Sequence, residues 1–433
     1  MRRVLLLSYY TPPRPGVATN RTSQLLRYLP AHGWEPTAVT PVLPGAGPDV
    51  VQTPYVDVLQ TMKRFAGLGS ANTHAALGTT PTAHGSRPNL RQRAIEFAYA
   101  VATYPDAQVG WFLRGRGAVA KLLASGNYDA VLSSSPPFTT NLMVASLSPR
   151  IPWIADFRDL WGDARSGTGI TGFLDKNLER WTLGKARALT TISEPLARIL
   201  QQRRGGVPVH VVENAFDPQE WFGVPFETED RCTLLYAGQL FGGRRDPRPL
   251  FRAVRALIES GEIARDDVRI DFYSLSEPWL TDQIREHNLE GVVRVPGVVS
   301  RERVMAAERR ADRLLVLLWD EDNSEGVLTG KLFEYLGARR RILAVGGPQR
   351  SAVDDILAAT GAGTRGRDER ALALEVRAAV EEHKEQRVAV LDERAIEPYS
   401  ASQMARKFAE ILDGVTEPAT LLGREQQLRP EHS

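Results

Sequence analysis

Short apolar runs alternate with longer amphipathic runs along nearly the whole chain, and this alternation limits the possible folds more than any other feature. The runs "RVLLLSYY", "YDAVLSSS" and "PWIADFRD" are largely apolar over the length of one strand. Strands of this kind, separated by helical segments, are typical of parallel sheets that helices cover on both faces. The first half of the sequence therefore predicts a doubly wound α/β unit.

The same pattern restarts near Cys232. "CTLLYAGQL", "VRIDFYSL" and "DRLLVLLWD" are the first strands of a second series, and amphipathic segments such as "DPRPLFRAVRALIES" separate them. We therefore expect two doubly wound units in tandem. The expected domains are residues 1–213 with a mobile loop at 66–90, a connection at 214–231, a second domain at 232–395, a helix at 396–413 that packs back toward the first domain, and a polar tail at 414–433.

Composition excludes several classes of protein. The chain has 433 residues, of which 42% are hydrophobic and 24% charged, and its net charge of +2 does not favour a nucleic-acid partner. Cys232 is the only cysteine, so we expect no disulfide framework and a buried structural thiol. The start "MRRVLLLSYYTPP" resembles a signal peptide, but its apolar run is short and Pro12 and Pro13 end it. We expect a cytoplasmic protein, or one peripheral at the inner face of a membrane.

The stretch "SEGVLTGKLFEYLG" follows a predicted strand and opens a helix near Thr329 and Gly330. Free backbone N–H groups at such a helix start suit a phosphate. Lys331 lies in the first turn, where a cation is unfavourable unless an anion is bound there. Glu334 shares a face with Lys331, so its carboxylate could bind a ribose diol. In the alternative interpretation, Lys331 and Glu334 simply pair with each other.

A second strand end supplies further positive charge. In "YAGQLFGGRRDP" the strand ends at Gly238, and Gly243 precedes Arg244 and Arg245. Glycines let the backbone approach a ligand, and arginine suits a diphosphate. A solvated surface loop is the alternative interpretation.

The first unit offers two candidate polar groups at strand ends. The loop "SYYTPPRPGVATNR" contains Gly16 and Asn20, but it lacks the GxGxxG dinucleotide fingerprint. "IADFRDLWGD" places Asp156, Arg158 and Asp159 at the end of a predicted buried strand, where they could bind sugar hydroxyls. A structural ion-pair network is the alternative for that group.

We expect no metal site. "DED" at residues 320–322 matches the short DxD pattern of metal-binding sugar-nucleotide enzymes, but the loop around it is acidic in general. The seven histidines are scattered without ligand spacing, and the HExxH, P-loop and EF-hand motifs are absent from the sequence.

Taken together, these stretches resemble the glycosyltransferases of GT-B fold, specifically the family-four retaining group. The resemblance covers roughly residues 3–413 and rests on "LLLSYYTPPRPGVATNRTSQLLRYL", "VLSSSPPFTTNL", "TTISEPLARIL", "VVENAFDP", "LLYAGQLFGGRRDP" and "GVLTGKLFEYLG" in this order. It implies an α/β fold of two Rossmann-like doubly wound parallel-sheet domains that face each other across a cleft.

The resemblance also assigns residue roles. It implies that Glu334 holds the donor ribose and that Thr329 and Gly330 meet the diphosphate through backbone amides. Arg244 takes the place of a basic residue on the diphosphate, Gly16 lies in the loop beneath the donor phosphate, and Asp156 lies near a strand end where many members have a histidine. Three features depart from the family pattern. Eight residues separate Glu325 from Glu334, whereas seven separate the two glutamates of the family, so strict spacing selects Gly326. Gln239 replaces the usual arginine, and the histidine is not evident.

The sequence thus predicts a retaining hexosyltransferase that moves a sugar from a nucleoside diphosphate sugar to an acceptor hydroxyl, with no cofactor and no metal. The expected catalytic residues are Arg244, Lys331, Glu325 and Asp156. The expected donor-binding residues are Gly16, Gly238, Gln239, Gly243, Arg245, Gly326, Thr329, Gly330 and Glu334. The expected acceptor-side residues are Arg158, Asp159 and Asn20. A sugar-nucleotide epimerase, a C–N coupling pseudo-glycosyltransferase and a non-catalytic nucleotide-sugar-binding subunit remain alternatives.

The acceptor is a glycan, a lipid-linked molecule or a small molecule, in polysaccharide or natural-product biosynthesis. Residues 87–121 interleave basic and aromatic side chains, which is compatible with peripheral contact with a membrane. An ordinary pair of helices with a core-facing side is the alternative.

Overall fold

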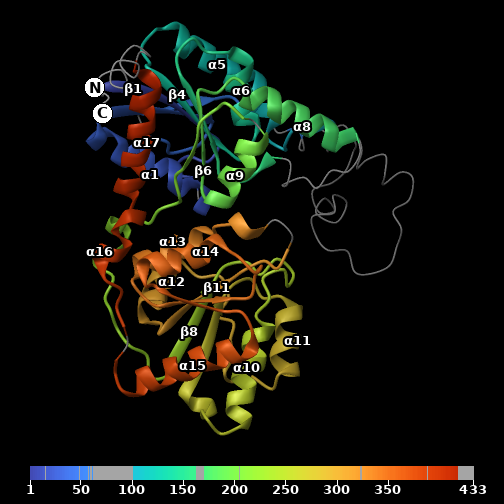
Figure 1. Cartoon of the computed structure of the whole chain (residues 1–433), viewed down its shortest axis with the longest axis vertical. Coiled ribbons are helices and arrows are strands. Elements are labelled where there is room, and N and C mark those ends of the chain that lie inside the picture. The colour runs from blue at the N-terminus through green and yellow to red at the C-terminus, as the bar shows by residue number, and fades with distance from the viewer. Residues whose placement is uncertain are drawn as a thin grey trace, which may run out of the picture. The chain divides into compact units, whose positions relative to one another are not determined.

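Two parallel sheets, each with its own helices, form the framework of the chain in the computed structural model (Figure 1). The structure describes residues 1–14, 16–47, 49–56, 58, 61, 101–161, 170–203, 205–321, 324–387 and 389–417. The chain divides into two units. The first consists of residues 1–192, 196–212 and 405–433, and the second of residues 193–195 and 213–404. Within the described part, no helix is both long and apolar enough to span a membrane.

The sheet of the first unit has seven strands in the order β3-β2-β1-β4-β5-β6-β7. All its pairings are parallel. The strands are β1 (Arg2–Ser8), β2 (Trp34–Pro41), β3 (Val50–Thr53), β4 (Ala130–Ser135), β5 (Trp153–Phe157), β6 (Ala188–Thr191) and β7 (Val209–Val211). The described helices include α1 (Asn20–Tyr28), α5 (Phe112–Ala124), α6 (Thr139–Leu147), α8 (Ile170–Leu183) and α9 (Glu194–Arg203). The strand order reverses between β1 and β4, which is the position where doubly wound sheets bind ligands.

The sheet of the second unit has six strands in the order β10-β9-β8-β11-β12-β13, again all parallel. The strands are β8 (Cys232–Ala237), β9 (Val268–Tyr273), β10 (Val293–Arg294), β11 (Arg313–Leu317), β12 (Ile342–Val345) and β13 (Gly363–Gly366). The helices are α10 (Arg248–Glu259), α11 (Pro278–Glu286), α12 (Arg301–Arg310), α13 (Gly330–Ala338), α14 (Ala352–Thr360), α15 (Glu369–Lys384) and α16 (Glu393–Ile396). In Figure 1, α12, α13 and α14 cover one face of this sheet, and α10 and α15 cover the other. The order reverses between β8 and β11.

The apolar strand runs are buried as their composition predicts. Val4, Leu5, Leu6 and Leu7 of β1 are fully inaccessible, as is the Cys232 thiol, whose pKa burial raises well above its usual value. A protonated, buried thiol is inert toward oxidation and metals. This fits the structural role expected for Cys232.

The C-terminal segment differs from the expected helix at 396–413. A short helix α16 is followed by a 3-10 turn at Glu397–Tyr399 and then by α17 at Ala401–Thr416. Pro398 lies in that turn, and because proline lacks an N–H group and clashes with the preceding turn, it separates the two helices. Residues 414–416, expected in the polar tail, instead complete α17. The expected mobile loop at 66–90 lies outside the described residues.

A buried ion pair joins five elements of the first unit. Arg21 of α1 donates two hydrogen bonds, of 2.9 and 2.8 Å, to the carboxylate of Asp156 at the end of β5. Ser134 of β4 and Thr190 of β6 donate to the same carboxylate at 2.8 and 2.7 Å. The guanidinium group also lies 4.9 Å from the ring centroid of Phe408 in α17. Both charged side chains are almost inaccessible, and both carboxylate oxygens of Asp156 have partners.

We expect Asp156→Asn to lower the free energy of unfolding by about 3–5 kcal/mol, because it leaves the buried Arg21 cation without its counter-charge. Urea unfolding followed by circular dichroism measures this change. Asp49→Asn, at an exposed carboxylate of the same unit, serves as the matched control and should change stability by less than about 0.5 kcal/mol. Equal effects of the two substitutions would contradict the structural role of the pair.

Candidate functional site

The carboxyl ends of β8 and β11 bring most of the predicted donor-site residues of the second unit together. Gly238 follows β8, and the loop that carries Gly243, Arg244 and Arg245 follows directly. Thr329, Gly330 and Lys331 follow β11 at the start of α13. Because the two strands are hydrogen-bonded neighbours, both loops emerge at the same edge of the sheet.

The side chain of Lys331 lies over the carboxyl end of β8. A side chain at Gly238 would overlap both the Nζ and the Cε of Lys331, so a larger residue there would force the lysine head group to move. Gly238 also has φ of 140°, in the region that other residues avoid. The Nζ lies 5.7 Å from the ring centroid of Tyr236, the aromatic residue that precedes this turn in β8. Gly238 therefore serves the site by making space for a cation.

Burial dominates the electrostatics of Lys331. Removal from water, and to a lesser extent the positive charge of Arg245, lowers the pKa of its ammonium group to about 8, although Glu334 and Glu308 act in the opposite direction. No carboxylate in the described part of the chain forms an ion pair with this ammonium group. A buried cation of this kind favours an anionic partner, because an added negative charge would restore the lost solvation.

The first turn of α13 presents backbone donors next to this cation. Thr329 caps the helix, and its hydroxyl accepts a hydrogen bond from the Lys331 N–H at 3.4 Å. The carbonyl of Thr329 accepts the Leu332 N–H at 3.1 Å, so the helix begins properly at Gly330. A helix start with its dipole directed outward and a lysine in its first turn can bind a phosphate group.

Arginines and aromatic rings form the opposite wall. Arg244 is half-exposed, donates to Glu321 at 2.7 and 2.6 Å and lies 4.7 Å from the Trp319 ring centroid. Arg245 donates to the Tyr236 hydroxyl at 3.1 Å and stacks 5.0 Å from the ring centroid of Phe241. An anion could exchange places with Glu321 on Arg244, because that pair is exposed and weakly bound.

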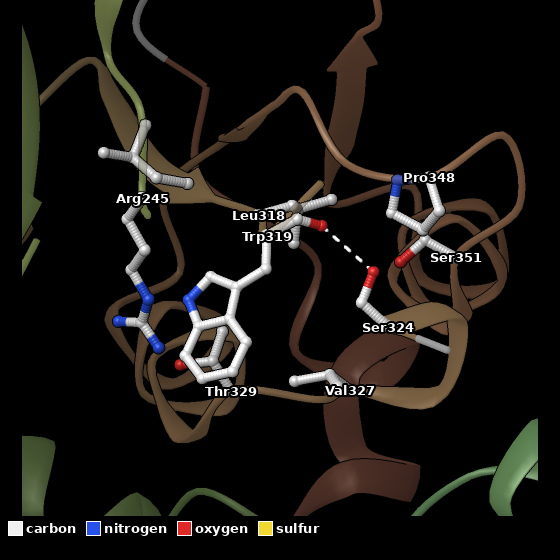
Figure 2. Close-up of a pocket in the computed structure, with 9 residues that line it drawn as sticks. Arg245, Leu318, Trp319, Ser324, Val327, Thr329, Pro348 and Ser351 are labelled. Carbon is white, nitrogen blue, oxygen red and sulfur yellow. Dashed lines mark hydrogen bonds between the residues drawn. The ribbon is translucent and has the colours of Figure 1, made fainter. Parts of the chain in front are cut away.

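A small cavity lies between these elements. It measures about 20 Å³ and is lined by Arg245, Trp319, Thr329, Ser351 and five further residues. Figure 2 shows Arg245, Trp319 and Thr329 on one side of the cavity, with Pro348 and Ser351 on the other. Ser324 donates from its hydroxyl to the Trp319 carbonyl at 3.1 Å, which fixes the loop that precedes α13. The cavity accommodates about one water-sized group.

Glu334 is held by an arginine that the sequence analysis did not select. The guanidinium group of Arg301, at the start of α12, donates to Glu334 at 2.8 Å and to Glu220 at 2.6 Å. Lys331 and Glu334 therefore do not form the internal ion pair considered as an alternative. Arg301 therefore fixes the Glu334 carboxylate in position.

The remaining donor-side predictions have mixed surroundings. In the 3-10 turn at Ser324–Gly326, Glu325 is exposed and Gly326 is buried. The acidic side chain and the position that the family spacing would select, Gly326, therefore lie in different environments. Gln239 contributes its backbone carbonyl, which accepts from the Tyr236 hydroxyl at 2.8 Å. Gly243 packs against the Trp279 ring of α11, with a φ of 92°.

In the first unit the structure supports the ion-pair alternative for Asp156. Its carboxylate is fully occupied by Arg21, Ser134 and Thr190, so it has no exposed oxygen for a sugar. Arg158 is similarly occupied, because it donates to the carbonyls of Ala18 and Pro136 at 3.0 and 2.8 Å. The sequence could not distinguish these partners from a ligand, because a buried network and a binding cluster use the same residue types.

Three other predicted residues of the first unit remain accessible. Gly16 is exposed with φ of 114°, Asn20 is the first residue of α1, and Asp159 is exposed. Gly16 and Asn20 follow β1 and Asp159 follows β5. The structure leaves their acceptor-side role as a prediction.

Sequence analysis missed Glu308. This residue lies in α12 and is completely inaccessible, and neither carboxylate oxygen has a hydrogen-bond partner. The signal was present in the helical periodicity of "RERVMAAERRA", because residue 308 shares a face with the buried Met305. A buried acidic residue without a hydrogen-bond partner is unusual in a folded protein and indicates a role beyond packing.

No cluster of three or more potential metal-ligating side chains occurs among the residues that the structure describes. Asp322 of the "DED" pattern lies outside them. Asp320 and Glu321 are exposed, and Glu321 is paired with Arg244.

The comparisons with known proteins agree with this fold. Residues 16–215 match the family model of the glycosyl transferase 4-like domain. No curated protein sequence matches the chain.

Solved structures of similar architecture cover nearly the whole chain. Sucrose-phosphate synthase from Thermosynechococcus elongatus is 13% identical over 98% of this chain and 99% of its own, with a TM-score of 0.54. A glycosyltransferase from Rickettsia africae ESF-5 is 13% identical over 96% and 99%, with a TM-score of 0.59. A putative UDP-N-acetylglucosamine 2-epimerase from Listeria monocytogenes is 13% identical over 95% and 96%, with a TM-score of 0.55. These likenesses confirm the predicted GT-B fold with its two Rossmann-like domains.

Lys331→Met should stabilise the free protein at neutral pH by on the order of 1–3 kcal/mol, because it removes a desolvated charge while filling the same space. The gain should shrink as the pH rises from about 8 to 10.5, where the unfolded chain still holds a proton that the folded chain has released. Urea unfolding over this pH range measures the difference. The control is Lys121→Met, at an exposed lysine of α5, which should change little. If Lys331→Met were less stable than the wild type, the desolvated ammonium group would not be destabilising the free protein.

Proposed function

We propose that this chain is a retaining glycosyltransferase that moves a hexose-type sugar from a nucleoside diphosphate sugar to an acceptor hydroxyl. The observation that carries the proposal is the desolvated ammonium group of Lys331, which lies in the first turn of α13 and forms no ion pair with any carboxylate that the structure describes. The donor diphosphate would bind there, with the backbone donors of the helix start and the guanidinium groups of Arg244 and Arg245 around it. The glycosyl transferase 4-like domain and the GT-B fold support this class of reaction.

The chemistry follows from the charge that develops during transfer. As the bond between the sugar and the diphosphate breaks, negative charge accumulates on the leaving phosphate oxygen. Preorganised cations in a poorly solvated site stabilise such charge more than water does. Lys331 and Arg244 are therefore the proposed catalytic residues, and the acceptor hydroxyl attacks from the face that the diphosphate leaves.

The other groups of the site would orient the donor. Glu334, fixed by Arg301, would accept hydrogen bonds from the ribose hydroxyls, and Gly238 would leave the backbone close to the diphosphate. Glu325 is the proposed sugar contact, because its side chain is exposed next to the start of α13. Asp156 is withdrawn from the catalytic set in this proposal, because its carboxylate is enclosed in the first unit.

The acceptor is proposed by class only: a glycan, a lipid-linked molecule or a small molecule. Residues 101–121 lie within the described part of the segment predicted to contact a membrane. There, Leu113 and Arg114 are both exposed near the start of α5. An exposed leucine beside an arginine supports the lipid-linked class.

Two measurements in sequence test the function. Calorimetry with UDP, GDP and dTDP first identifies the base that binds, and the products formed from the matching sugar donors are then analysed. A new glycoside with retained anomeric configuration supports the proposal. An epimerised sugar nucleotide would instead indicate an epimerase, a C–N coupled product the pseudo-glycosyltransferase, and binding without turnover the non-catalytic subunit.

Lys331→Ala and Arg244→Ala should each reduce turnover by on the order of 10²-fold, as expected for the loss of one group that stabilises developing charge. Initial rates at saturating donor measure the effect on the chemical step. Arg252→Ala, at an exposed arginine of α10 paired with Glu369, is the matched control and should leave turnover unchanged. Near-normal turnover of both site variants would defeat the assignment.

Transfer should persist in excess EDTA, because two cationic side chains and a helix start supply the charge that a divalent metal would otherwise provide. The rate is measured before and after chelation, and again after Mg²⁺ or Mn²⁺ is added. A complete loss of activity that either metal restores would transfer the diphosphate role to the acidic loop at 320–322.

A further inference from the structure

Glu308 is a buried carboxyl group that the proposed reaction does not yet use. It lies in the third turn of α12, which packs against α13 and β8, beneath the proposed donor site. Its side chain is inaccessible, and neither oxygen accepts or donates a hydrogen bond within the described residues. An unpartnered buried polar group costs about 1–3 kcal/mol, so a merely structural position would favour an apolar residue.

The charged groups that act on Glu308 belong to the donor site or hold its residues in place. Burial raises its pKa well above the usual value, and Glu334 adds to that effect, whereas Arg301 and Lys331 oppose it. The groups that face it or its lysine neighbour are Lys331, Glu334 and Tyr335 of α13, Arg301 of α12, Tyr236 of β8 and Arg245 of the following loop. The proton on Glu308 is therefore sensitive to the charge state of the site.

Because burial raises the pKa of Glu308, its carboxyl group is ionised in the empty site only where the pH exceeds that raised pKa. In the empty site its negative charge favours the protonated form of Lys331. A bound diphosphate supplies that negative charge itself, so an additional buried carboxylate would repel it. Transfer of a proton from solvent to a Glu308 oxygen removes this repulsion, with the carboxylate going from a charge of −1 to neutral and the buffer losing one proton.

We propose that Glu308 is a positioning residue of the donor site, whose carboxyl group takes up a proton from solvent when the donor diphosphate binds beside Lys331. This inference rests on the proposed function. Donor binding thereby becomes coupled to pH through a residue that touches neither the diphosphate nor the sugar. At pH values above about 8, Lys331 gains a proton on binding, and Glu308 gains one wherever the pH exceeds its own raised folded-state pKa.

Calorimetry of nucleoside diphosphate binding in buffers of different ionisation enthalpy tests the inference. UDP, GDP and dTDP are the probes, and each is titrated into the wild-type protein and into Glu308→Gln between about pH 7 and pH 9. The wild type should take up as many as one proton more than the variant. Its affinity should therefore fall with pH more steeply, by up to tenfold per pH unit. Glu302→Gln, at an exposed residue of the same helix, should behave as the wild type does.

The outcomes separate this inference from the function on which it rests. Binding with equal proton uptake by the wild type and Glu308→Gln would overturn the role of Glu308 and leave the donor site intact. If none of the three nucleotides binds the wild type, the donor site itself is overturned, and this inference with it. A purely structural Glu308 would change thermal stability but not the number of protons taken up.

Unfolding at varied pH gives an independent readout without a ligand. Because the pKa of Glu308 is higher in the folded than in the unfolded chain, the stability of the wild type relative to Glu308→Gln should be greatest below about pH 4.5. That relative stability should be lost as the pH rises through the folded-state value. Parallel pH profiles of the two proteins would overturn the inference. If Glu308→Gln does not fold, Glu308→Met replaces it in both measurements.

Discussion

A positive charge held out of water is the constraint on which the second unit's site depends. Lys331 lies beneath Gly238 and beside the ring of Tyr236, where it cannot be fully solvated and has no carboxylate within ion-pair distance in the described chain. The cap at Thr329, the neighbouring arginines and the two glutamates act on the same charge. Such a site is unstable while empty and is stabilised by an anion, which is the condition that a donor-binding site should meet.

The first unit handles a buried charge in the opposite way. Arg21 and Asp156 neutralise each other, and Ser134 and Thr190 satisfy the remaining hydrogen-bonding capacity of the carboxylate. Nothing is left for a ligand to complete. The first unit's pair fixes the ends of its strands, whereas the second unit's lysine is the cation to which we assign the donor diphosphate. Burial alone does not distinguish these roles, but the completeness of the hydrogen bonding does.

Local patterns in the sequence were sufficient to predict the fold and part of the site. The apolar runs of β1 and β8 predicted parallel strands. The glycines and arginines after β8 lie at the same sheet edge as Thr329 and Lys331, because the carboxyl ends of neighbouring parallel strands meet there. The sequence alone could not predict which side chains from distant segments pair with each other. The pairing of Asp156 with Arg21 and of Glu334 with Arg301 depends on which helix packs over which strand. Glu308 was overlooked because a glutamate in an amphipathic helix ordinarily faces water.

The missing side chain at Gly238 has a consequence for how this sequence can vary. Any larger residue there occupies the volume of the lysine head group, and any shorter residue at 331 leaves that volume empty. The two positions therefore share one small space, although they belong to different βα segments. A substitution at residue 238 or residue 331 alone is disfavoured, so related sequences should change both residues together or keep both.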